Sequence, residues 1–205
     1  PFCGSAVEEV GANLFCPNKY CRPRIIGKIE HFAQKDAMDI EGLSEMTAGQ
    51  LHDTLGLKQC SEIYSHNSED LARLDGFKDK KITNLLNALQ KSKTVSLDRF
   101  IFALGIDGVG KVAAKDLAKE YGSITALSSA DKEGLVSLEN IGEITAEAIC
   151  GWFADADNAE EVNRLLSAGI SPTLAAKAPA DGVFAGQFVV LTGTLENYKR
   201  SEAGK

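Results

Sequence analysis

The chain of 205 residues has no long hydrophobic run. Apolar stretches such as FVVL at 188–191 fall far short of the about 20 residues that a membrane-spanning helix needs. The first residues, PFCGSAVEEV, lack the basic start and apolar segment of a secretory signal. The sequence does not begin with methionine, so we expect a piece cut from a longer protein of the cytoplasm.

An excess of positive charge is also missing, because the net charge is −7. Proteins that bind a polyanion usually present a basic surface, and this balance argues against a nucleic-acid partner at face value. The charges are unevenly distributed, however. The segment 76–119 has nine Lys or Arg residues and only four Asp residues. A basic segment of this kind is typical of a local surface that binds a polyanion. A lysine-rich face that only contacts solvent has the same composition.

One five-residue pattern recurs four times. It has an apolar residue, an acidic residue, Gly or Asn, an apolar residue, and then Ser, Lys or Gly. We call the copies hairpins 1 to 4: residues 40–44 (IEGLS), 74–78 (LDGFK), 106–110 (IDGVG) and 138–142 (LENIG). Five and eight residues past the central apolar position lie further apolar residues: Ala48, Ile82, Ala114, Ala146, Leu51, Leu85, Leu117 and Ile149. The common spacing predicts a repeat of two helices joined by a tight turn.

The third position of each hairpin should require a positive φ angle. Gly42, Gly76, Gly108 and Asn140 are residue types that adopt this conformation cheaply. The amides after the turn have no helical partner, and the helix dipole adds positive potential, which suits a phosphate. A plain connection with a glycine cap explains any single copy equally well. Four copies in register favour the anion site.

These repeats resemble helix-hairpin-helix motifs, which hold duplex DNA by backbone amides on phosphates and therefore bind without reading sequence. Hairpin 3 is the best match, because it alone has both glycines of the motif, and valine at either glycine should impair binding without unfolding. The resemblance implies two pseudo-twofold pairs of motifs. It assigns DNA binding to Gly42, Leu43, Ser44, Gly76, Phe77, Lys78, Lys80, Gly108, Val109, Gly110, Lys111, Asn140, Ile141 and Gly142.

The N-terminal segment has the composition of a metal site. Cys3, Cys16 and Cys21 are separated by twelve and four residues, and tetrahedral zinc takes four such ligands. Pro1-Phe2-Cys3 looks like the end of a C-P-x-C knuckle whose first cysteine preceded Pro1, and His31 is the alternative fourth ligand. A disulfide is disfavoured in a cytoplasmic protein. We interpret Cys60 and Cys150 as small apolar residues.

The order of these parts resembles the C-terminal half of the bacterial NAD-dependent DNA ligases. The amino-acid sequence also resembles that of this family at residues 31–44 (HFAQKDAMDIEGLS) and 100–123 (FIFALGIDGVGKVAAKDLAKEYGS). The resemblance implies a mainly α fold: a small Cys-type zinc finger at 1–30, a helix-hairpin-helix domain of four motifs at 31–170, a linker at 171–183 and the first strand of a truncated α/β BRCT domain at 184–205. Thr192-Gly193 in that strand could bind phosphate, or could simply be a turn.

In this family a lysine of a K-x-D-G motif attacks NAD+, carries AMP to the 5′-phosphate at a nick, and Mg2+ assists sealing by the 3′-hydroxyl. The nearest string here begins with Arg73 (RLDG), and a protonated arginine cannot be the nucleophile. We therefore expect a Zn2+-containing clamp on nicked double-stranded DNA, inactive alone, monomeric, without a membrane partner and associated with the nucleoid. The alternatives are a DNA-binding or scaffold subunit of another repair complex, and a helical interaction domain that does not bind DNA.

Overall fold

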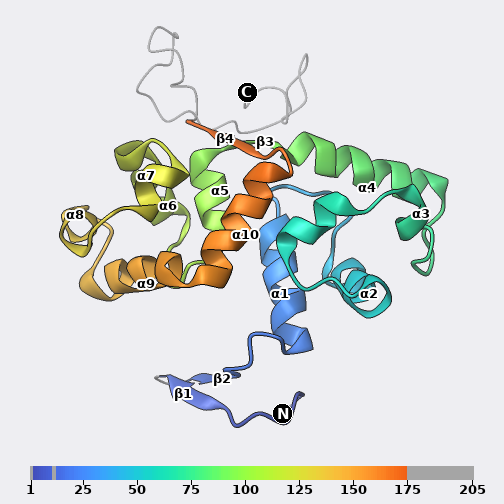
Figure 1. Ribbon diagram of the computed structural model, residues 1–205, viewed down its shortest axis with the longest axis horizontal. Coiled ribbons are helices and arrows are strands. Elements are labelled where there is room, and N and C mark those ends of the chain that lie inside the picture. Colours follow the sequence, from blue (N-terminus) through green and yellow to red (C-terminus); the bar gives the residue numbers. More distant parts are fainter. Residues whose placement is uncertain (1, 11–12, 175–205) are drawn as a thin grey trace, which may run out of the picture. The chain divides into compact units, whose positions relative to one another are not determined.

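The computed structural model describes residues 2–10 and 13–174, and these are mainly helical (Figure 1). Two short strands pair antiparallel near the N-terminus, β1 (Glu8–Val10) and β2 (Asn13–Phe15). The elements that follow are α1 (Arg22–Ala33), α2 (Glu45–Leu55), the 3-10 helix η1 (Cys60–Ser65), α3 (Ser68–Leu71), α4 (Asp79–Ser92), β3 (Thr94–Ser96), α5 (Leu97–Ala103), α6 (Lys111–Tyr121), α7 (Ile124–Ser128), α8 (Lys132–Val136), α9 (Glu143–Ala154), α10 (Ala156–Ser167) and β4 (Ser171–Thr173). None of the described helices is long and apolar enough to cross a membrane.

Each of the four hairpins joins two helices, as the repeat predicts. The pairs are α1 and α2, α3 and α4, α5 and α6, and α8 and α9. The central apolar positions and the positions five and eight residues later are all buried: Leu43, Phe77, Val109, Ile141, Ala48, Ile82, Ala114, Ala146, Leu51, Leu85, Leu117 and Ile149. The helix periodicity therefore marks the faces that form the core, because residues four apart lie on one side of a helix.

The helices after hairpins 1 and 3 begin and end at residues suited to those positions. Ser44 caps α2, and its Oγ accepts a hydrogen bond from the Thr47 amide at 3.4 Å. Gly56 ends α2 with φ 74°, and Gly122 ends α6 with φ 68°, a conformation that glycine adopts without steric cost. These caps fix where each hairpin stops and its helix starts.

Helix α10 fastens the end of the helical region to its middle. Its Glu161 is only 2% exposed. One carboxylate oxygen accepts a hydrogen bond from the Ser61 amide at 2.8 Å, and the other from the Ser61 hydroxyl at 2.6 Å. Beyond α10, β4 pairs in parallel with β3, and the Ser171 amide donates to the Lys93 carbonyl at 2.8 Å. The C-terminal helix and strand thus bridge segments that are far apart in the sequence.

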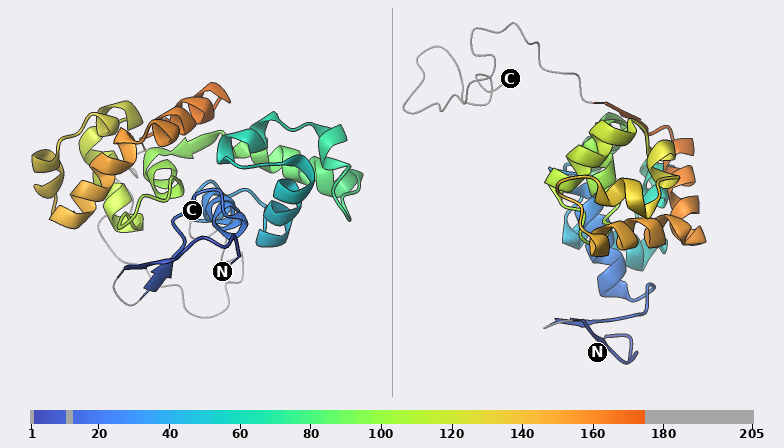
Figure 2. Two further views of the ribbon diagram at one scale, coloured as in Figure 1. Left: turned by 60° about the horizontal axis from the view of Figure 1, so that its bottom comes forward. Right: turned by 90° about the vertical axis from the view of Figure 1, so that its left-hand side faces the viewer.

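Helix α1 crosses the limit expected between the zinc finger and the helix-hairpin-helix domain. It begins at Arg22, next to the cysteine-rich segment, and buries Ile25, Ile29 and Phe32 in the helical core. The cysteine-rich segment lies beyond the N-terminal end of α1 (Figures 1 and 2). The first residues of the expected linker, Ser171–Thr173, form strand β4. The rest of that linker from 175 and the expected BRCT strand with Thr192-Gly193 lie outside the described residues.

Candidate nucleic-acid interface

All four hairpins close with the same hydrogen bond, from the amide of the central apolar residue to the carbonyl three residues earlier. The donor and acceptor pairs are Leu43 to Ile40 (3.2 Å), Phe77 to Leu74 (3.2 Å), Val109 to Ile106 (3.0 Å) and Ile141 to Leu138 (3.0 Å). The side chains of these central residues are buried. Leu43, Phe77, Val109 and Ile141, which the resemblance places among the DNA-binding residues, therefore hold the turns, and a ligand would meet their neighbours.

The positive φ angle expected at the third position is confirmed in three hairpins. Gly42, Gly76 and Gly108 have φ angles of 90°, 70° and 77°. The expectation for Asn140 is wrong, because Asp39 is the only non-glycine residue with a positive φ in the described part of the chain. The Asn140 side chain instead donates a hydrogen bond to Asp116 of α6 at 2.6 Å. The left-handed conformation is sterically costly for a residue that has a Cβ atom. Hairpin 4 closes its turn without that conformation, so Asn140 does not incur this cost.

The residues after the central positions present exposed amides. Ser44, Lys78, Gly110 and Gly142 are the N-caps of α2, α4, α6 and α9, and all four are exposed. Their carbonyls accept the first helical hydrogen bonds, at 2.8 to 3.0 Å. Among the described residues no group accepts a hydrogen bond from their amides. These amides, with those of the first helical turn, form an array of donors at the positive end of a helix dipole.

Hairpin 3 has the most favourable charges for an anion. Helices α2, α4 and α9 each begin with an acidic residue, whereas the first turn of α6 contains none. A carboxylate beside the donor array would oppose a phosphate, because like charges repel at short range. The backbone angles and space at Gly110 are also permissive: its φ is −83°, and an added Cβ would meet nothing within 4 Å.

Hairpins 3 and 4 contact each other's second helix. A Cβ added at Gly108 of hairpin 3 would lie 3.0 Å from Thr145 Oγ1 at the start of α9. In return, Asn140 of hairpin 4 bonds Asp116 in α6. Hairpin 1 similarly borders α4, with a cavity of about 440 Å³ between Gly42 and the polar residues Lys81 and Lys91. The contacts between hairpins 3 and 4 are reciprocal, as expected for one pair of motifs. They also correct the expectation that valine at Gly108 would leave folding intact, because Gly108 has a positive φ and a packing contact that a side chain would strain.

The lysines that are predicted to bind DNA differ in whether they already form an ion pair within the protein. Lys78 and Lys80 are exposed, and no ion pair involves either of them within the described ranges. Lys111 pairs with Asp36 at 2.7 Å, and this ammonium group lowers the pKa of the Asp36 carboxyl. Asp36 lies 75 residues earlier in the chain, so no local pattern could identify it. Asp36 therefore reduces the positive charge that Lys111 presents to a phosphate, although this exposed ammonium group retains further N–H donors.

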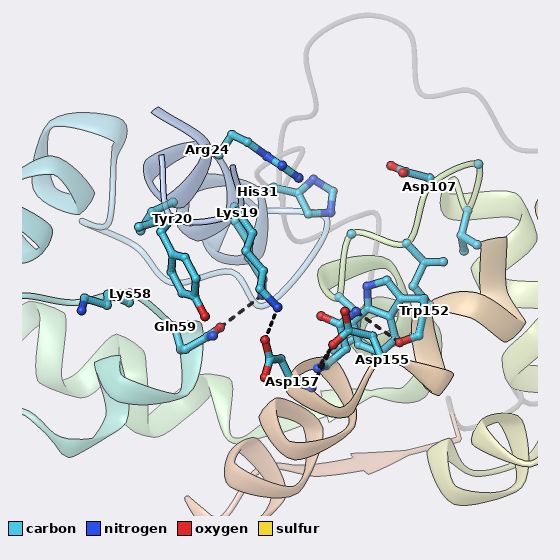
Figure 3. Close-up of a pocket in the computed structure, with 18 of the residues that line it drawn as sticks. Lys19, Tyr20, Arg24, His31, Lys58, Gln59, Asp107, Trp152, Asp155 and Asp157 are labelled. Carbon is cyan, nitrogen blue, oxygen red and sulfur yellow. Dashed lines mark hydrogen bonds and ion pairs between the residues drawn. The ribbon is translucent and has the colours of Figure 1, made fainter. Parts of the chain in front are cut away.

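A cleft of about 730 Å³ borders hairpin 3, and Gly108, Gly110 and Lys28 are among its lining residues. The basic residues Lys19, Arg24 and Lys58 lie across the cleft from the aromatic ring of Trp152 (Figure 3). Three carboxylates share the cleft, and Asp157 forms an ion pair with Lys19. Sequence reasoning missed this set, because its members come from segments that only folding brings together.

The three N-terminal cysteines converge, as their spacing predicts. The Sγ atoms of Cys3, Cys16 and Cys21 all lie within 4.8 Å of one another, and those of Cys3 and Cys16 are 3.4 Å apart. Hydrogen bonds from the Ser5 side chain and backbone are the main cause that lowers the pKa of the Cys3 thiol to about 6, whereas burial raises the pKa of Cys21. The set offers three corners of a tetrahedral site for a metal ion.

His31 cannot serve as the fourth ligand in this conformation. Its Nε2 lies 2.7 Å from the Phe102 carbonyl oxygen, and its Nδ1 lies 2.8 Å from the Gln34 amide nitrogen. Both ring nitrogens are therefore engaged far from the cysteines. Cys60 is buried and its pKa is raised to about 12 by burial, which fits its interpretation as a small apolar residue. Cys150 is half-buried beside the core.

Comparison with known proteins agrees with the hairpin geometry. The helix-hairpin-helix motif family matches residues 99–162. DNA ligases from Alkaliphilus metalliredigens and Alkaliphilus oremlandii are 45% and 44% identical to the chain over 203 residues, and DNA ligase 2 of Clostridium acetobutylicum is 41% identical over 202. The alignments cover 98% of this chain but only 30–31% of those ligases. The chain is thus similar over nearly its whole length to DNA ligases, of which it spans about a third, and its residues 99–162 match the helix-hairpin-helix motif family.

Proposed function

We propose that this chain is the part of an NAD-dependent DNA ligase that clamps duplex DNA without sequence specificity. The observation that carries the proposal is the array of hairpin amides that have no acceptor among the described residues, above all at the exposed N-cap Gly110 of hairpin 3. Backbone amides are the same in every residue and face phosphates that are the same in every sequence, so such contacts position a duplex but do not read it. They also let a chain with net charge −7 bind a polyanion.

The complete ligase would seal nicks between a 3′-hydroxyl and a 5′-phosphate during replication and repair. NAD+ and Mg2+ would take part in that chemistry through residues outside this chain. We propose that the chain alone is inactive, because Arg73 begins its nearest match to the K-x-D-G motif and arginine stays protonated. Its own contribution would be to hold the duplex, as a monomer, beside the nick.

Titration of fluorescent nicked and intact duplexes with the 205-residue chain tests this function. We expect comparable affinities for duplexes of different sequence. The logarithm of the association constant should fall with the logarithm of salt concentration with a slope of about −2 to −3, because each lysine–phosphate contact contributes about −0.9 and amides release no counterions. Failure to bind any duplex, or a strong preference for one sequence, would contradict the proposal.

We further propose that Zn2+ occupies the site formed by Cys3, Cys16 and Cys21. Thiolates are the ligands that structural zinc prefers, and a Zn–S distance of about 2.3 Å places the sulfur atoms of a tetrahedral site about 3.8 Å apart. The metal would cross-link the segment before α1, whose Arg24 donates a hydrogen bond to the Cys16 carbonyl at 2.7 Å.

Replacing Cys16 with serine is expected to reduce zinc content by at least about tenfold, because the remaining two thiolates do not complete a structural site. Elemental analysis of the purified protein after dialysis measures it. Cys150→Ser is the matched control and should keep the zinc of the unmodified chain. Far-UV circular dichroism should show that the helices remain in both variants. Equal zinc contents in both variants would refute the site.

A further inference from the structure

The second residue of the helix after each hairpin has an unusual exposure. In three repeats this residue is large and apolar: Met46 is 75% exposed, Val112 63% and Ile144 85%. The remaining repeat, the second, has Lys80 at the same position. Single exposed apolar residues are normal on protein surfaces. Three of them at the same position of a repeat are not scattered, and they indicate a shared contact.

The neighbours of these side chains restrict what can cover them. Each lies two residues after an N-cap whose amide is exposed, at the positive end of a helix dipole. A partner must therefore offer negative charge and apolar surface within a few ångströms. The sugar-phosphate backbone of DNA does so, because each phosphate is flanked by the C–H groups of deoxyribose.

The charges of the hairpins explain why an apolar contact is useful here. In hairpins 1 and 4 the apolar residue follows an acidic one, Glu45 or Glu143. That carboxylate weakens the attraction of the amide array for phosphate. A contact between Met46 or Ile144 and a sugar does not depend on charge, because burial of apolar surface contributes free energy in proportion to area.

We propose that Met46, Val112 and Ile144 pack against deoxyribose groups next to the phosphates that the hairpin amides hold. This proposal rests on the proposed function and adds to it an uncharged, salt-independent component of DNA binding. Lys80 at the equivalent position of the second repeat supplies a charged contact with phosphate instead. The clamp would thus combine three apolar contacts and one ionic contact at a single structural position.

A variant with Met46→Gln, Val112→Thr and Ile144→Thr tests the proposal. Met46→Gln and Val112→Thr keep the approximate size of the side chain, Ile144→Thr is one methyl group smaller, and all three replace apolar surface by polar atoms. We expect binding of duplex DNA to weaken about tenfold, because three partial apolar burials contribute at least ~1.4 kcal/mol together. The salt slope should not change. Thermal unfolding should also be unaltered, because all three side chains are exposed.

Lys80→Gln is the matched comparison at the same position. This variant should also weaken binding, but its salt slope should become shallower by about 0.9, as loss of one ion pair requires. Vesicles of phosphatidylglycerol and phosphatidylcholine provide the second arm, because an anionic lipid surface also combines charge and apolar groups. The proposal would be contradicted if the unmodified chain bound these vesicles more tightly than DNA and the triple variant lost that vesicle binding. The three apolar side chains would then contact a membrane surface instead of DNA.

The outcomes separate this inference from the function on which it rests. If the unmodified chain binds no duplex, the proposed function and the inference both fail. If it binds DNA and Gly110→Asp weakens binding, but the triple variant binds within twofold of the unmodified chain, only the inference fails. A triple variant with a shallower salt slope would also overturn it, because the lost contacts would then be ionic.

Discussion

Aspartate in place of Gly110 is expected to weaken binding of duplex DNA about a hundredfold and to leave the helices folded. Gly110 is the N-cap of α6 with φ −83°, an angle that any residue adopts, and a side chain there meets open space. Aspartate is also a preferred N-cap residue, so the helix should be at least as stable. Its carboxylate, however, would accept from the amides that we assign to phosphate, and like charges placed together cost several kcal/mol.

Gly110→Asn is the matched control for charge. Asparagine is an equally good N-cap of nearly the same shape, and it can also occupy one amide. We therefore expect it to weaken binding about tenfold or less. Fluorescence anisotropy with a nicked duplex measures both affinities, and urea unfolding checks that neither variant is less stable. Equal affinities of the two variants and the unmodified chain would show that hairpin 3 does not face the DNA.

Removal of the Glu161 side chain should have the largest effect on stability, and we expect Glu161→Ala to lower the free energy of unfolding by about 3 kcal/mol. The carboxylate is buried and accepts from the amide and the hydroxyl of Ser61. Alanine would leave the buried Ser61 amide without an acceptor, which costs about 1–3 kcal/mol, and would lose a charge-assisted hydrogen bond worth about 1.5–3 kcal/mol.

Ser61→Ala provides the graded comparison for that contact. It removes only the hydroxyl donor and keeps the bond from the Ser61 amide to Glu161, so a loss of about 1.5–2 kcal/mol, near the lower end of the range for a hydrogen bond to a charged group, is expected. Urea denaturation followed by circular dichroism gives both values. A change smaller than about 1 kcal/mol in Glu161→Ala would mean that water replaces the contact, and that α10 does not secure η1 through it.

The repeat and its turns could be predicted from the sequence because their determinants lie within a few residues. The glycines at the third positions of hairpins 1 to 3 adopt positive φ, and the apolar positions five and eight residues past each centre are buried. Local geometry of this kind depends on steric limits and helix periodicity alone. The convergence of the three cysteines followed from ligand spacing for the same reason.

The remaining features depend on contacts between distant segments. Nothing near Asn140 indicates that its side chain bonds Asp116, and nothing near Lys111 indicates that Asp36 neutralises it. The bond from Ser61 to Glu161 joins residues 100 positions apart. Strand β4 likewise forms only because β3 lies beside it. Sequence patterns identify which residues are polar, but only the packed helices determine their partners.

The proposed contacts would explain how an acidic protein can hold DNA with few lysines. A hairpin amide array supplies donors from the backbone, at the end of a helix dipole that carries about half an elementary charge. Lysine side chains can then form ion pairs within the protein, as Lys111 does with Asp36 and Lys19 does with Asp157. The expected consequence is weaker salt dependence than a lysine-rich surface would give.

The amide resonances of the hairpins provide the most direct test of the central claim. In a titration of the 15N-labelled chain with a nicked duplex, the backbone amides of Gly108 and Gly110 should show large downfield proton shifts, because each would donate a hydrogen bond to a phosphate oxygen. Amides in the buried centre of α6, such as that of Leu117, should move little. Unperturbed Gly108 and Gly110 amides in a chain saturated with DNA would contradict the account.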